Sequence, residues 1–198
     1  MKTTSIVMSK VALSVPILVL VAGMLSGCVG VVLGGAAGGA SVINDPRTAG
    51  SQVEDESIEL KAGNALRGHK ELNQQVHINV TSYNQVVLLT GEAPTEDMRT
   101  QVFELVKGIE KVRTTHNEIT IAAPSPLTSR TADSWLTTSV KAKIVGAKEL
   151  NAIRIKVVTE AATVYLLGLV TQSEGDLAAQ IASQTAGVQR VVKLFEYQ

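Results

Sequence analysis

The residue with the clearest chemistry is Cys28, the only cysteine in the chain. Two lysines and an apolar run over residues 11–25 come before it, and the small residues Ser26 and Gly27 lie directly ahead of the thiol. Basic, apolar and small, in that order, is the pattern of a secretory signal peptide. The apolar run is shorter than the roughly 20 residues of a membrane-spanning helix, so a signal peptide over residues 1–27 is favoured over a transmembrane segment.

Residues 25–28, Leu-Ser-Gly-Cys, resemble a bacterial lipobox, whose cysteine becomes the first residue of the mature protein and carries acyl chains such as palmitate. A lone thiol in an exported protein is expected to have a use, and lipid attachment at Cys28 supplies one. Two or more acyl chains hold a protein at a membrane without spanning it. In the lipoproteins that this motif resembles, an aspartate after the cysteine retains the protein in the inner membrane, so Val29 implies the outer membrane. The alternative is an ordinary signal followed by a buried or free Cys28.

Residues 28–52 begin with a charge-free stretch of glycine, alanine and valine. We expect this segment to be a flexible tether. Its glycines also recur four residues apart, so a helix-packing ladder of small residues is the alternative.

The remainder of the chain contains an internal repeat with a spacing of about 78 residues. Lys-Glu-Leu-Asn occurs at 70–73 and again at 148–151, and the segments that follow also match. Two copies of one small domain are therefore predicted, at residues 53–122 and 131–198. A proline-containing linker at 123–130 joins them.

Each copy is predicted to have the element order α-β-β-α-β. Apolar residues at helical spacing mark a first helix in each copy, and Asp55 and Asp133 are placed to cap these helices. A β-hairpin, a second helix (residues 95–107 and 173–186) and a last strand (112–121 and 191–197) follow. The expected fold is α+β, with a three-stranded mixed sheet and two helices on one face in each copy.

This element order resembles the BON domain, with apolar strands ending at Gly91 and Gly168 and helices ending at Gly108 and Gly187. Two copies behind a lipobox, with residues 45–52 ahead of the first, resemble the dual-BON outer-membrane lipoproteins of the DolP (YraP) family over nearly the whole mature chain. The resemblance implies a lipid-anchored protein on the periplasmic face of the outer membrane. It also implies binding of anionic phospholipid through the second copy, support of outer-membrane integrity and a place at division sites.

The first helices of the two copies differ in chemistry. The first opens with several acidic residues. In the second, the only charged residues between Asp133 and Glu149 are lysines. Trp135, the only tryptophan, lies away from the apolar stripe on a helical wheel and should face outward. Lysines near an anionic membrane contribute about 1 kcal/mol each, and an indole favours the membrane interface. The predicted phospholipid-binding residues are Trp135, Thr138, Ser139, Lys141, Ala142, Lys143 and Lys148.

On the residues alone, packing of Trp135 against the other copy or the linker is an alternative, and the family resemblance favours lipid. A rival from another class is a protein-interaction adaptor without direct lipid recognition, which would contact outer-membrane assembly or cell-wall remodelling machinery. The first copy has seven basic and eleven acidic residues between 53 and 121. This acidic balance suggests envelope-protein partners for the first copy and argues against nucleic acid.

The sequence contains no pattern typical of an enzyme. Its three histidines, His69, His77 and His116, are widely spaced, and there is no second cysteine, no His-x-x-x-His pair and no glycine-framed serine. His77 is expected to alternate outward as a surface residue. We therefore predict no catalytic residues, no metal ligands and no cofactor.

Overall fold

The computed structural model describes residue 45 and residues 47–198. Cys28, the predicted signal peptide and most of the predicted tether lie outside the described residues. Among the described helices, none has the length and apolar character needed to span a bilayer.

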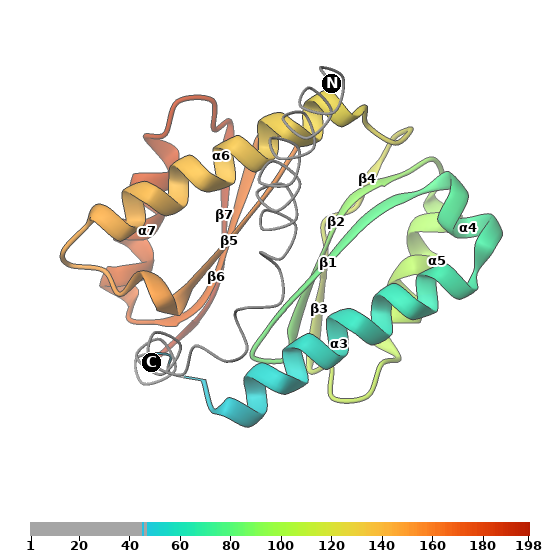
Figure 1. Cartoon of the computed structure of the whole chain (residues 1–198), viewed down its shortest axis with the longest axis horizontal. Coiled ribbons are helices and arrows are strands. Elements are labelled where there is room, and N and C mark those ends of the chain that lie inside the picture. The colour runs from blue at the N-terminus through green and yellow to red at the C-terminus, as the bar shows by residue number, and fades with distance from the viewer. Residues whose placement is uncertain (1–44, 46) are drawn as a thin grey trace, which may run out of the picture. The chain divides into compact units, whose positions relative to one another are not determined.

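The first repeat folds as two main helices against a mixed sheet (Figure 1). Its elements are α3 (Ala49–Gly68), α4 (Lys70–Gln75), β1 (His77–Tyr83), β2 (Val86–Ala93), α5 (Glu96–Lys107), β3 (Thr114–Asn117) and β4 (Thr120–Ile121). Strand β2 is central: β1 pairs with it antiparallel, and β3 and β4 pair with it parallel. The antiparallel pair is a hairpin, and α5 is the crossover that allows the parallel pairing.

The second repeat has the same arrangement. Its elements are α6 (Leu127–Gly146), η1 (Ala152–Arg154), β5 (Ile155–Glu160), β6 (Thr163–Val170), α7 (Gln172–Ser183) and β7 (Arg190–Tyr197). The strand order is β5-β6-β7, with an antiparallel hairpin and a parallel last strand. The predicted α+β fold, with two helices and a mixed sheet in each repeat, is confirmed.

The structure adds details that the sequence pattern did not predict. The short helices α4 and η1 precede the hairpins, and the last strand of the first repeat is interrupted at Glu118 and Ile119. Ile119 is buried and joins the core of its repeat. Helix α6 begins at Leu127, so helical residues occupy the second half of the segment 123–130 that was predicted to be a linker.

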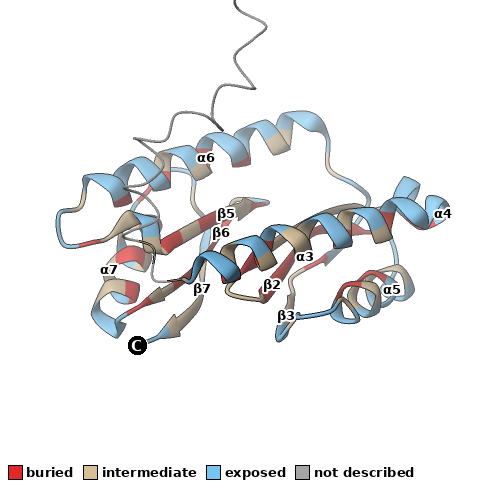
Figure 2. Ribbon diagram, turned by 60° about the horizontal axis from the view of Figure 1, so that its bottom comes forward, coloured by how far each residue is buried: buried red, intermediate tan, exposed pale blue. Residues whose placement is uncertain are grey.

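Each repeat has its own apolar core between its helices and one face of its sheet. In the first, Ile58 and Ala62 of α3 meet Val87 and Leu89 of β2. In the second, Val140 and Ile144 of α6 take part in a core with Val164 and Leu166 of β6. In Figure 2 the buried positions form one stripe along α3 and along α6, and the rest of each helix surface is exposed. These helices are therefore amphipathic, as their spacing predicts.

A third apolar cluster covers the opposite faces of the two sheets. It contains Tyr83 and Leu88 from the first repeat and Tyr165 and Leu167 from the second, all buried. Burial raises the pKa of Tyr83 to about 12. Every residue of β2 is buried, because alternate side chains enter the first core and this shared cluster. A strand covered on both faces gives a continuous apolar run, which explains the sequence from Val86 to Leu89.

Polar contacts surround this shared cluster. Lys156 of the second repeat donates to Glu59 at 2.9 Å, and the hydroxyl of Tyr83 donates to the carbonyl of Arg154 at 3.1 Å. Arg113 and Glu196 form an ion pair across the repeats at 2.5 Å. The two repeats thus share a buried apolar contact with a hydrogen-bonded rim.

The prediction that Asp55 and Asp133 cap the first helices is wrong. Both lie inside helices and are buried, because α3 begins six residues before Asp55, with Thr48 accepting the capping hydrogen bond. The Asp133 carboxylate instead accepts hydrogen bonds from the backbone N–H groups of Ala161 (3.0 Å) and Ala162 (2.9 Å). These two residues form the hairpin turn between β5 and β6, so the aspartate connects the helix to the turn.

The hairpin turns need this connection because their backbones are strained. Ala161 and Ala162 have φ values of 47° and 57°, and Asn84 and Gln85 in the first repeat have 51° and 65°. Left-handed residues match the twist of a two-residue hairpin but cost roughly 1–2 kcal/mol each when they are not glycine. Asp55 binds the N–H groups of Asn84 and Gln85, each at 2.7 Å. Charge-assisted hydrogen bonds offset the strain in both repeats.

We predict that Asp133→Asn lowers the free energy of unfolding by about 2–3 kcal/mol. The two turn N–H groups donate to different carboxylate oxygens, so the asparagine amide would face one of them with a donor. Urea unfolding followed by circular dichroism measures the effect. Asp176→Asn is the matched control, because Asp176 is 55% exposed and pairs with Lys193 on the surface. This variant should lose much less stability than Asp133→Asn, because exposed ion pairs contribute little. Equal losses in the two variants would contradict the assignment.

Candidate functional site

Helix α6 presents one buried and one exposed face. Asp133, Leu136, Val140 and Ile144 are its buried residues and face the sheet of the second repeat. Asp133 is the only acidic residue in the helix, and its carboxylate is occupied by the hairpin turn. The exposed face therefore has no negative side chain.

Trp135 lies on the exposed face, where 62% of its surface is accessible. The prediction that the indole faces outward is confirmed. It borders a groove of about 430 Å³ whose lining includes Ala132, the turn residues Ala161 and Ala162, and Gly187. Most of the residues that line this groove are small.

Two further apolar side chains are exposed on α6, Leu127 (76%) and Val145 (70%). At 100° per residue, Leu127 and Val145 point in about the same direction and Trp135 lies roughly 80° from them. All three apolar side chains lie on the outer side of the helix, separated by threonine, serine and alanine residues. Leu127 and Val145 were not among the predicted residues of this surface, although their angle, well away from the buried stripe, can be read from a helical wheel.

Hydroxyl groups on the exposed face are already hydrogen-bonded within the helix. Thr138 donates to the carbonyl of Ser134 at 3.0 Å, and Ser139 donates to that of Trp135 at 2.9 Å. Thr131 makes the same kind of bond to Leu127. Because their donors are satisfied, these groups lose less when water is removed from the helix surface.

The predicted lysines occupy three different positions. Lys141 is exposed on the outer face beside Ala142. Lys143 lies on the flank and donates to the carbonyl of Gln184 at 3.2 Å. Lys148 follows the helix and borders a shallow depression with Val145 and Glu174. The structure thus brings Trp135, Thr138, Lys141 and Ala142 onto one face, with Ser139 half-buried at its margin.

The equivalent helix of the first repeat is chemically different. Two of its acidic residues form ion pairs with other parts of the chain. Glu54 pairs with Lys111, and Glu59 pairs with Lys156 of the second repeat. Of the acidic residues that open this helix, Glu56 remains exposed, while Glu54 and Glu59 are half-buried. Ser57 occupies the position of Trp135, two residues after the buried aspartate.

The expectation that His77 is a surface residue is wrong. Its side chain is 18% exposed, and Nδ1 lies 3.0 Å from Oε2 of Glu92. The alternation along β1 correctly directs His77 away from the first core. The second repeat covers that face of the sheet, however, and the sequence pattern of one repeat does not predict this contact.

The two repeats have the element order of BON domains, and the family model for the BON domain matches residues 54–123 and 132–198. Together these matches span most of the chain. The chain therefore belongs to the BON-domain family, as a protein with two BON repeats of the DolP lipoprotein kind.

Three relatives share most of the chain. The outer membrane lipoprotein DolP of Haemophilus influenzae is 42% identical over 173 residues, which cover 87% of this chain and 90% of the relative. The 21 kDa hemolysin of Actinobacillus pleuropneumoniae is 37% identical and covers 77% of this chain and 79% of its own. Osmotically-inducible protein Y of Escherichia coli is 26% identical, with 77% of both chains covered.

The 42% identity to DolP, which is named an outer membrane lipoprotein, confirms the predicted location as an outer-membrane lipoprotein. None of the three relatives has the name of an enzyme.

We predict that acrylamide quenches the fluorescence of Trp135 in the folded protein about as strongly as in the urea-unfolded chain. The indole is 62% exposed, and with no other tryptophan present the signal reports this side chain alone. Quenching of residues 44–198 in lipid-free buffer measures it. A blue-shifted, protected emission before any lipid is added would contradict the exposed position.

Proposed function

We propose that this outer-membrane BON protein binds anionic phospholipids through the exposed face of α6. In this role it supports outer-membrane integrity and acts at division sites. The protein has no catalytic role in this proposal. The observation that supports it best is the exposed indole of Trp135 on a helix whose outer face has lysine but no free carboxylate.

The chemistry of this face suits the headgroup region of a bilayer. An indole combines an apolar ring with one N–H donor and settles at the membrane interface. Leu127 and Val145 add apolar area on the same side, and Lys141 supplies a charge for lipid phosphates. The internally bonded hydroxyls of Thr138 and Ser139 reduce the cost of dehydration. An amphipathic helix of this type lies in the interface plane without crossing the membrane.

We predict that Trp135→Ala weakens association with vesicles containing phosphatidylglycerol by about tenfold, or about 1.4 kcal/mol. Flotation of residues 44–198 measures the association without any contribution from an acyl chain. Both repeats are retained because Tyr83 and Leu88 share a buried cluster with the second repeat. The matched control is Val53→Ala, because Val53 is 66% exposed at an early position on α3. Unchanged flotation of the Trp135 variant, or equal losses in both, would overturn the proposal.

We predict that Lys141→Gln weakens the same association about fivefold, because one lysine near an anionic surface contributes about 1 kcal/mol. The loss should disappear on neutral phosphatidylcholine vesicles and shrink as salt rises, since exposed charges are screened beyond about 10 Å at 0.1 M. Glu56→Gln on α3 is the control, because this exposed charge lies on the other repeat. A Lys141 effect that persists on neutral vesicles would contradict an electrostatic contact.

A protein-interaction adaptor is the second candidate function. Val53 (66%) and Leu60 (62%) are exposed on α3, seven residues apart, with Glu56 between them. This apolar pair with an acidic neighbour suits an envelope-protein partner. Under the adaptor function the folded chain would not float with anionic vesicles, and its loss of function in cells would follow Val53 and Leu60 variants.

A further inference from the structure

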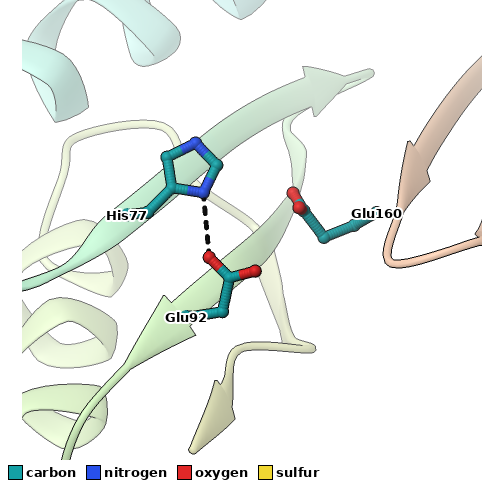
Figure 3. Close-up of side chains that lie close together, drawn as sticks. All are labelled: His77, Glu92 and Glu160. Carbon is teal, nitrogen blue, oxygen red and sulfur yellow. Dashed lines mark hydrogen bonds and ion pairs between the residues drawn. The ribbon is translucent and has the colours of Figure 1, made fainter. Parts of the chain in front are cut away.

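Three side chains that can act as metal ligands lie close together beside the contact between the two repeats. His77 on β1 and Glu92 on β2 lie opposite each other in the antiparallel register, and Glu160 ends β5 in the second repeat. Figure 3 shows the imidazole and both carboxylates directed toward one another. Their nearest ligand atoms all lie within 4.8 Å of one another.

The two carboxylates have little positive charge to balance them. Glu92 is 7% exposed and Glu160 is 8% exposed. Glu92 contacts His77 and the backbone N–H of Ser125. Within the described part of the chain, Glu160 accepts a hydrogen bond only from the amide of Asn79, at 2.8 Å, and has no cationic partner. Burying two neighbouring carboxylates is costly unless a cation or a proton compensates them.

Arg130 forms no ion pair with either carboxylate. It borders the same cavity, but its Nη2 donates to the carbonyl of Ser125 at 2.8 Å. Its Nε is buried and has no partner among the described residues. The contrast with Asp55 is clear, because that buried carboxylate has an ion pair with Arg47 at 2.9 Å.

The cluster adjoins a cavity of about 400 Å³ that His77 and Glu160 both line. This space admits an ion together with water molecules to complete its coordination. An imidazole nitrogen with two carboxylates is a donor set suited to zinc and to other divalent transition metals. Zinc bonds to these ligands at about 2.0–2.2 Å, so the side chains need shifts of only about 1 Å to close around an ion.

We propose that His77, Glu92 and Glu160 bind a divalent metal ion such as Zn²⁺. Because two ligands come from the first repeat and one from the second, the ion would connect the repeats directly. It would also neutralise the two buried carboxylates. None of its three ligands belongs to α6, the helix of the proposed lipid surface, although that helix lines part of the adjoining cavity.

Zinc titration of residues 44–198, which form one compact unit, tests the site. The expected result is one Zn²⁺ bound per chain, with a melting temperature that rises with zinc and falls back on adding EDTA. This fragment lacks Cys28, the only thiol in the chain. Absence of stoichiometric binding at micromolar zinc would overturn the proposal.

Variants assign the ligands. His77→Gln and Glu160→Gln should each weaken zinc binding by at least about tenfold, with circular dichroism confirming that they are folded. His69→Gln is the matched control, because His69 is an exposed histidine at the start of α4; its zinc affinity should match that of the unmodified chain. Equal affinity in all variants would show adventitious binding and overturn the site.

A measurement on the unmodified chain avoids any folding defect of the variants. One equivalent of zinc should shift the imidazole NMR signals of His77 and leave those of His69 and His116 unchanged. Equal shifts of all three histidines, or no shift of His77, would overturn the proposal.

Discussion

The packing of the two sheets on each other through Tyr83, Leu88, Tyr165 and Leu167 is the contact on which the rest of the structure depends. A single BON repeat of this size buries a limited apolar surface. Here the central strand of each repeat contributes to two cores, one beneath its own helices and one shared with the other repeat. The same contact leaves α3 and α6 on the sides of the sheets away from the shared cluster, where each can face solvent or a partner.

The shared contact also explains how the two repeats have diverged. An acidic residue of the first repeat forms an ion pair at the edge of this contact, because Glu59 of α3 pairs with Lys156 of the second repeat. The second repeat retains an outer helix with exposed Trp135 and Lys141, whose only acidic residue is buried beneath it. Asp55 and Asp133 hold the helix and hairpin together in the same way in both repeats. The scaffold is therefore conserved within the molecule, while the exposed helix surfaces differ.

Local sequence patterns predicted the fold of each repeat but not the relation between repeats. Helical spacing and hairpin signals are properties of short segments, so the order α-β-β-α-β and the outward position of Trp135 were both predictable. The buried aspartates were misassigned as helix caps, because an acidic residue near an expected helix start has the same sequence signature as one that binds a distant turn. His77 was misjudged for a similar reason. Its exposure depends on Glu160 and the second repeat, which lie more than 80 residues along the chain.

The proposed lipid contact and the predicted acylation of Cys28 would reinforce each other. One exposed indole, two smaller apolar side chains and one lysine on the outer face provide only a weak attachment on their own, because binding from solution also costs translational freedom. A tether to the same leaflet makes the encounter intramolecular, and the effective concentration then replaces most of that cost. In this proposal, the helix would add selectivity. The acyl chains would hold the protein on any lipid composition, whereas a cationic face without free carboxylates favours anionic regions of the membrane.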